Sequence, residues 1–191
     1  MDKQISKRSQ FPALLNFMRL NGNGVEVGVQ RGIHAKSLHD CWDCERLVLV
    51  DPWENQVGYN DIANVSTAKH MHHYRDVQLL FKDITNIEIV RDYSVNAAER
   101  FSEETFDFIY LDARHDYDGI MDDLAAWFPK LRKGGIIAGH DYLDGKLPEG
   151  DFGVKSAVKN FHKPMFDKDF VSKIYSTDEK WPSWYFFYNQ K

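Results

Sequence analysis

Five short apolar runs that alternate with helical patterns constrain the fold of this 191-residue chain more than any other feature of its sequence. Each run is rich in β-branched residues and almost continuously apolar, which is typical of a strand buried on both faces of a parallel sheet. The runs lie at 25–29, 46–51, 87–90, 106–112 and 135–141, and the helical segments at about 11–20, 33–40, 65–80, 94–103, 116–131 and 153–162. This alternation predicts an α/β fold with helices on both faces of the sheet.

The C-terminal segment departs from the alternation. Two strand-like stretches, FVSKIYS at 170–176 and SWYFFYNQ at 183–190, are separated only by TDEKWP. Parallel neighbours need a crossover connection of about a dozen residues or more, so these two stretches should pair antiparallel. We therefore expect an antiparallel hairpin at one edge of an otherwise parallel sheet.

The composition excludes several classes of function. The chain carries 24 Lys and Arg against 29 Asp and Glu, a net charge of −5, and it has no basic cluster of the kind that binds nucleic acid. No stretch approaches the roughly 18 apolar residues that span a bilayer, and the N-terminus has no secretory signal pattern. We expect a cytoplasmic protein that acts on a small molecule, with no nucleic acid and no membrane as partner. The sequence leaves open whether it forms a homo-oligomer.

The two cysteines, Cys41 and Cys44, form a C-W-D-C pair. A structural zinc site needs four ligands, and no second pair completes it. A redox pair opens a helix, where the helix dipole lowers a thiol pKa, whereas this pair follows a predicted helix. We interpret both as reduced thiols without a role in function.

A glycine turn after the first strand, in GVEVGVQRGIHAKSL at 24–38, predicts a nucleoside site. Gly28 and Gly32 flank a short connection into a helix, and Asp51 ends the next strand. A carboxylate there can accept hydrogen bonds from two vicinal ribose hydroxyls. The middle glycine of a dinucleotide fingerprint is missing, so a nucleoside without a diphosphate fits better. We infer S-adenosylmethionine (SAM), with Glu26 receiving its ammonium group.

The stretch FDFIYLDARHDYDGIMDDLAAWFPKLRKGGIIAGHDY at 106–142 resembles the class I methyltransferases of the Methyltransf_24 type, a group with many small-molecule O-methyltransferases. VEVGVQRG, LVLVDPWE and SWYFFY resemble the same family, so the similarity extends over about 24–189. The resemblance implies a Rossmann-like sheet of seven strands with the last strand antiparallel. It also implies a single domain over 1–191, with a helical cover at 1–23, a cofactor-binding core at 24–142, and a C-terminal helix and β-hairpin at 143–191.

In this fold the turn after the third strand lies beside the adenine ring. Asp92, Tyr93 and Ser94 occupy that turn, and we expect them to contact the base. Ser94 is also a good helix N-cap.

Two features lie near the second strand. The long loop at 53–64 follows Asp51 directly and offers Trp53 and Tyr59 as large flat surfaces, so it is a candidate lid over the cofactor, with Trp53 as a contact. His70 and His73 share one helical face, as metal ligands sometimes do. The helix around them is polar, and we expect a solvated face instead.

The resemblance also points to the reacting end. Related catechol and caffeoyl-type O-methyltransferases hold a divalent cation with one Asp after strand four and an Asp-Asp or Asp-Asn pair after strand five, where this chain has Asp112, His140 and Asp141. Oxygen ligands suit Mg²⁺ or Ca²⁺, and a histidine among them shifts the preference toward Mn²⁺, Fe²⁺ or Zn²⁺. The alternative, hydrogen bonding to the ligand without a metal, stays open. His115 lies three residues past Asp112, where the catechol enzymes carry a lysine base, and an ordinary imidazole pKa of about 6.5 suits proton removal.

These expectations combine into one interpretation with two alternatives. The first is a SAM-dependent O-methyltransferase for a small hydroxylated molecule or sugar, with Asp112 and His115 as catalytic residues and a divalent cation assisting. The alternatives are an NAD-dependent oxidoreductase on a Rossmann sheet and a non-catalytic nucleoside-binding module.

Overall fold

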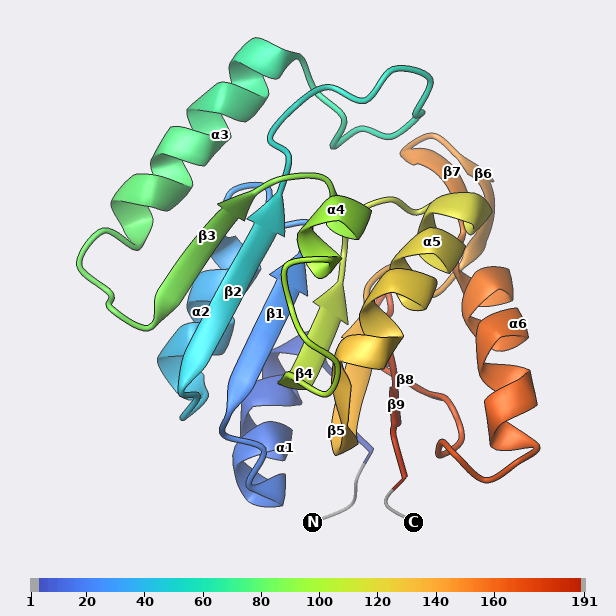
Figure 1. Ribbon diagram of the computed structural model, residues 1–191. Coiled ribbons are helices and arrows are strands. Elements are labelled where there is room, and N and C mark those ends of the chain that lie inside the picture. The colour runs from blue at the N-terminus through green and yellow to red at the C-terminus, as the bar shows by residue number, and fades with distance from the viewer. Residues whose placement is uncertain (1–3, 190–191) are drawn as a thin grey trace.

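A seven-stranded sheet forms the centre of the computed structural model, which describes residues 4–189. The strand order is β3-β2-β1-β4-β5-β9-β8, in which β1 to β5 are parallel, β9 is antiparallel to β5, and β8 is antiparallel to β9 (Figure 1). The strands are β1 (Asn23–Val27), β2 (Arg46–Asp51), β3 (Ile87–Arg91), β4 (Phe106–Leu111), β5 (Leu131–Gly139), β8 (Tyr175–Ser176) and β9 (Trp184–Phe187). The predicted α/β class, the seven strands and the antiparallel last strand are confirmed.

Helices cover both faces of the sheet, as the apolar strands predict. One layer holds α1, α2 and α3, and the other holds α4, α5 and α6 (Figure 1). The helices are η1 (Arg8–Gln10), α1 (Phe11–Met18), α2 (Ile33–Cys41), α3 (Thr67–Leu80), α4 (Ser94–Ala98), α5 (Tyr117–Trp127), η2 (Phe128–Lys130) and α6 (Val154–Phe166). Val25 and Val27 pack in the core with α5, whereas Leu47 and Leu49 pack in the core with α2. The strands are therefore buried on both sides.

The structure differs from the prediction in the shorter elements. A separate hairpin of β6 (Asp144–Leu147) and β7 (Gly150–Gly153) was not predicted, because every residue of β6 is exposed and the strand has no apolar alternation. The strand expected at 170–176 shortens to β8, and the helix expected at 94–103 ends at Ala98. Among the described residues, no helix is both long and apolar enough to cross a bilayer.

Two irregular segments meet above the carboxyl ends of the strands. The loop that follows β2 reaches the β6–β7 hairpin, where Asp61 forms an antiparallel bridge with Gly150. The backbone N–H of Ile62 donates to the carbonyl of Glu149 at 2.9 Å, which fixes the loop to the hairpin. Backbone pairing between these two segments, which are far apart in sequence, therefore encloses one side of the predicted site.

Candidate active site

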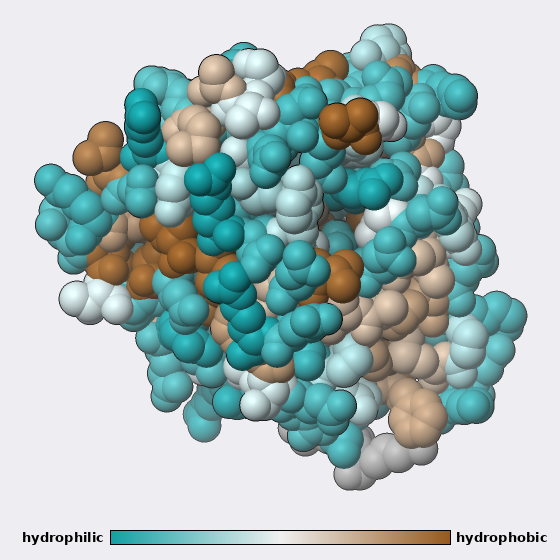
Figure 2. Space-filling view, turned by 45° about the horizontal axis from the view of Figure 1, so that its top comes forward, coloured by the Kyte–Doolittle hydropathy of each residue, from teal (hydrophilic) through white to brown (hydrophobic). Residues whose placement is uncertain are grey.

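Three adjoining cavities open at the carboxyl ends of the parallel strands. Their volumes are about 520, 140 and 70 Å³, and Gly28 and Ala113 line all three. Figure 2 turns the top of Figure 1, where these strand ends lie, toward the viewer, and shows a largely hydrophilic surface with separate apolar patches. A ligand crossing Gly28 could therefore extend from one cavity into the next.

The glycine turn has a structural cause that the sequence did not reveal. Gly28 has φ +92°, and a Cβ there would lie 2.0 Å from the carbonyl oxygen of Asp112. The backbone N–H of Asp112 in turn donates to the carbonyl of Val27 at 2.7 Å. Gly32, with φ +75°, occupies the N-cap of α2. Only glycine fits at position 28, because the turn after β1 packs directly on the end of β4.

Glu26 and His34 form a buried polar pair in the largest cavity. Glu26 is 1% exposed, and its Oε2 lies 3.5 Å from His34 Nδ1. Neither atom has a hydrogen-bond partner within the described part of the chain. Burial raises the pKa of Glu26, and the nearby imidazole offsets part of this effect. A buried acceptor without a partner is costly in an empty site and suits a cationic ligand group such as an ammonium.

Asp51 lies where the ribose was expected. Its Oδ2 accepts the backbone N–H of Gln30 at 2.8 Å, and its Oδ1 accepts that of Trp53 at 2.6 Å. Burial raises the pKa of this carboxyl, against these hydrogen bonds, which lower it. Each carboxylate oxygen keeps a second lone pair, so Asp51 can still accept two hydroxyl hydrogens in the smallest cavity, which it lines.

Two expectations near Asp51 are wrong. Trp53 is fully buried instead of forming a flat surface over the cofactor, because its indole N–H donates to the carbonyl of Gln30 at 2.8 Å and its ring packs on Tyr74. His70 and His73 are buried, not solvated, since α3 packs against this part of the fold. His70 lines the same small cavity as Asp51.

The turn after β3 borders the cavity of 140 Å³. Tyr93 and Ser94 line it, whereas the carboxylate of Asp92 pairs with Arg100 on the surface. Ser94 is not the N-cap, which is Tyr93. Its hydroxyl instead accepts the indole N–H of Trp127 at 2.9 Å.

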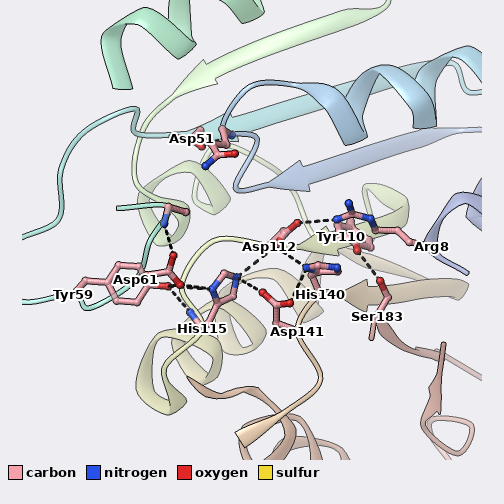
Figure 3. Close-up of polar contacts among 12 residues, drawn as sticks. Arg8, Asp51, Tyr59, Asp61, Tyr110, Asp112, His115, His140, Asp141 and Ser183 are labelled. Atoms are coloured by element: carbon pink, nitrogen blue, oxygen red, sulfur yellow. Dashed lines mark hydrogen bonds and ion pairs between the residues drawn. The ribbon is translucent and has the colours of Figure 1, made fainter. Parts of the chain in front are cut away.

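Carboxylates from three different segments surround His115 (Figure 3). Its Nδ1 lies 2.9 Å from Asp61 Oδ2, and its Nε2 lies 3.4 Å from both Asp112 Oδ1 and Asp141 Oδ2. The Tyr59 hydroxyl accepts the backbone N–H of His115 at 2.9 Å. These groups come from the loop after β2 and from the ends of β4 and β5, so the cluster exists only in the folded chain.

This environment shifts the pKa of both His115 and Asp112, which face each other as an ion pair. Burial alone would lower the pKa of His115, but hydrogen bonds to Asp112 and Asp61 raise it to about 10. Burial would raise the pKa of Asp112, yet the hydrogen bond from His115 and the charge of His140 lower it to about 2. The surrounding carboxylates therefore favour the protonated ring, which departs from the expectation of an ordinary imidazole pKa; a cation bound at Nε2 would displace that proton.

The same cluster has the composition of a cation site. One ligand atom each from Asp112, His115 and Asp141 lies within 4.8 Å of the others. His140 stands beside them, with Nδ1 3.0 Å from Asp141 Oδ1 and 3.7 Å from Asp112 Oδ1. Asp141 has φ +51°, a strained conformation for a residue other than glycine. The structure therefore places Asp112, His140 and Asp141 next to one another and adds His115 to the group.

Three residues of the cavity were not singled out from the sequence: Arg8, Asp61 and Phe152. Arg8 enters from η1, with Nη1 3.4 Å from Asp112 Oδ2. Phe152 of β7 stacks on the His115 ring, with centroids 5.5 Å apart and planes at 16°. Trp181, from the β8–β9 connection, packs on Phe152 at 5.8 Å. No local sequence pattern marks these residues, because each reaches the cavity through long-range contacts.

Comparisons with known proteins agree with this geometry. A family model described as a methyltransferase domain, Methyltransf_24, matches residues 25–142. A search of curated proteins finds no match to the sequence.

Similar solved structures share the fold at low sequence identity. An O-methyltransferase from Bacillus cereus in complex with SAH (S-adenosylhomocysteine) has a TM-score of 0.65 and 16% identity over 97% of this chain and 82% of that chain. The O-methyltransferase NovP has a TM-score of 0.62 and 20% identity over 96% and 78%. Cofactor-bound Rv0187 from MTB has a TM-score of 0.65 and 16% identity over 100% and 84%.

The matched family is one of methyltransferases and not of NAD-dependent oxidoreductases, and its model covers the glycine turn, Asp51 and the Asp112–Asp141 cluster. The chain belongs to the Methyltransf_24 family of SAM-dependent methyltransferases.

Proposed function

We propose that this methyltransferase transfers the methyl group of SAM to a hydroxyl oxygen of a small molecule, such as a hydroxylated ring or a sugar. The observation that carries the proposal is the buried cluster of Asp112, His115 and Asp141 in the wall of the cavity that also holds Glu26. Carboxylates and an imidazole beside the methyl donor are suited to binding a hydroxyl group, and a cation held by them would lower the pKa of that hydroxyl.

In this proposal each of the three cavities binds a different chemical part of SAM. The buried Glu26 carboxylate, whose Oε2 has no hydrogen-bond partner within the described part of the chain, accepts the ammonium group, and Asp51 accepts the ribose hydroxyls. Tyr93 and Ser94 border the base, while Asp92 stabilises their turn through Arg100. SAM supplies an electrophilic methyl group. Gly28 lines all three cavities, and Gly32 starts the helix whose N-terminus faces the largest of them.

A divalent cation fits the acidic cluster. Asp112, His115 and Asp141 are the proposed ligands, with His140 as a neighbour that can replace His115. Two oxygens and one imidazole nitrogen suit Mn²⁺ or Fe²⁺ better than Mg²⁺. A bound cation would lower the pKa of a hydroxyl that approaches it. Asp61, at 2.9 Å from Nδ1, would hold the orientation of the His115 ring and leave Nε2 as its ligand atom, as carboxylates beside metal-bound histidines commonly do.

Apolar side chains border the same cavity on the acceptor side. Phe152 and Trp181 form an aromatic wall next to His115, and Ile62 lies at the rim. Such a wall excludes water and packs against the flat face of a ring, aromatic or sugar.

Cys41 and Cys44 are both free, which fits a protein of the reducing cytoplasm.

The test is transfer from SAM carrying a ¹³C-labelled methyl group to a panel of phenols, catechols and monosaccharides. We expect labelled product whose methyl resonance has the chemical shift of an O–CH₃ group, and no product from the Asp141→Asn variant. A label found only on nitrogen or carbon, across a panel that includes amines, would contradict the proposal.

A further inference from the structure

An N-terminal segment outside the region matched by the family model carries a cation into the largest cavity. The backbone N–H of Ile5 donates to the Tyr185 hydroxyl at 2.8 Å, and that of Asp178 donates to the carbonyl of Ser6 at 2.9 Å. The backbone N–H of Arg8 donates to Glu179 Oε2 at 2.7 Å. The C-terminal hairpin thus fixes this segment and, with it, the Arg8 side chain over the site.

The Arg8 guanidinium is held loosely by the protein itself. Its Nη1 lies 3.4 Å from Asp112 Oδ2 (Figure 3), longer than the roughly 2.7–2.9 Å of a strong charge-assisted hydrogen bond. A guanidinium has five N–H donors, and the contacts with Asp112 and Tyr110 leave donors for a ligand. Arg8 is therefore placed in the cavity with hydrogen-bonding capacity to spare.

Acidic side chains outnumber arginines in the lining of the largest cavity. The acidic residues that line it are Glu26, Asp61, Asp112, Asp141 and Glu149. Two arginines, Arg8 and Arg31, line it as well. The charge of Arg31 acts on His73 of α3, whereas the charge of Arg8 acts on Glu26 and Asp112. Arg8 is thus the arginine beside the carboxylates, where an anionic ligand group needs a counter-charge.

An α-amino acid carries its ammonium and carboxylate on one carbon, so the two groups must be bound by neighbouring charges of opposite sign. Glu26 and Arg8 form such a pair in one cavity. We propose that Arg8 binds the carboxylate of the methionine part of SAM, while Glu26 binds the ammonium group. The inference rests on SAM being the methyl donor, and it assigns the N-terminal segment to the donor site.

The test compares two ligands and four variants by isothermal titration, and the variants are Arg8→Met, Arg8→Lys, Lys7→Met and Arg31→Met. SAH has the amino-acid end, whereas 5′-methylthioadenosine has the adenosine and thioether without it. Arg8→Met should weaken SAH binding by about 10- to 100-fold, the size expected for losing a hydrogen-bonded charge pair, and should leave 5′-methylthioadenosine binding unchanged. Arg8→Lys should restore part of the loss. Lys7→Met, which removes an exposed charge from the same segment, should change neither affinity.

Several results would overturn the inference. Unchanged SAH affinity in Arg8→Met would assign the guanidinium to an anionic acceptor instead. An equal loss for both ligands would mean that Arg8 supports the fold of the site, and selective loss in Arg31→Met alone would place the carboxylate at the glycine turn. If the wild-type protein binds neither SAH nor 5′-methylthioadenosine, the proposed donor is wrong and this inference fails with it.

Discussion

Asp123 of α5 gives the protein a pH-dependent stability that can be worked out from its surroundings. The residue is 4% exposed, and its Oδ2 has no hydrogen-bond partner within the described part of the chain. Burial raises the pKa of this carboxyl to about 7, with the charge of Asp122 adding to the effect and Ser94 opposing it. An unfolded Asp has a pKa of about 3.9.

Because the folded pKa is the higher one, the folded state binds the proton more tightly than the unfolded state. The contribution of Asp123 to stability is complete below about pH 4 and is lost as the pH rises through 7. Between pH 5 and pH 8 ionisation of this one group should lower the free energy of unfolding by roughly 2 to 3 kcal/mol. For a chain of this length that corresponds to roughly 5–10 °C in Tm.

The Asp123→Asn variant removes the titration while keeping the shape of the side chain. Urea unfolding at pH 5, 6, 7 and 8 should show the variant gaining roughly 2 to 3 kcal/mol on the wild type across this range. Asp118→Asn, an exposed carboxylate on the same helix, is the control and should run parallel to the wild type. A constant difference between Asp123→Asn and the wild type at all four pH values would refute the reasoning.

Three further predictions address the site. SAH should raise the Tm of the wild type, and Asp51→Ala should abolish that shift because the ribose loses two acceptors; an equal shift in the variant would remove Asp51 from the site. Gly28→Ala should destabilise the protein by about 3 kcal/mol or more in urea unfolding, since its Cβ would lie 2.0 Å from the Asp112 carbonyl. Gly58→Ala, with a similar positive φ and no atom within 4 Å, should cost only about 1 kcal/mol; equal costs would contradict the packing argument. Excess EDTA should reduce methyl transfer and Mn²⁺ should restore it at least as well as Mg²⁺, whereas full activity in protein shown by elemental analysis to be metal-free would rule out the cation.

The fold was predictable because the apolar runs directly reflect burial. The strand from Leu47 to Val50 is apolar on both faces, and that alone indicates a sheet between two helical layers. Glu26, Asp51 and Asp112 could also be placed, since the carboxyl ends of parallel strands share one edge of the sheet.

What the sequence did not reveal depends on contacts between distant segments. Asp61 and Arg8 reach the cavity because a loop pairs with the β6–β7 hairpin and because a terminus is fixed by the C-terminal hairpin. The same long-range packing buries Trp53 and His70. The pKa of His115 could not be inferred either, since carboxylates from three segments raise it.

The central claim is that SAM lies across Gly28, with its reacting end facing the cluster of Asp112, His115 and Asp141. A crystal structure of the protein with SAH and Mn²⁺, with anomalous data collected for manganese, tests it most directly. We predict SAH with its amino-acid end beside Glu26, its ribose on Asp51 and its base beside Tyr93, and an anomalous peak among the cluster residues. SAH bound outside the three cavities, or in the reverse orientation, would contradict the account.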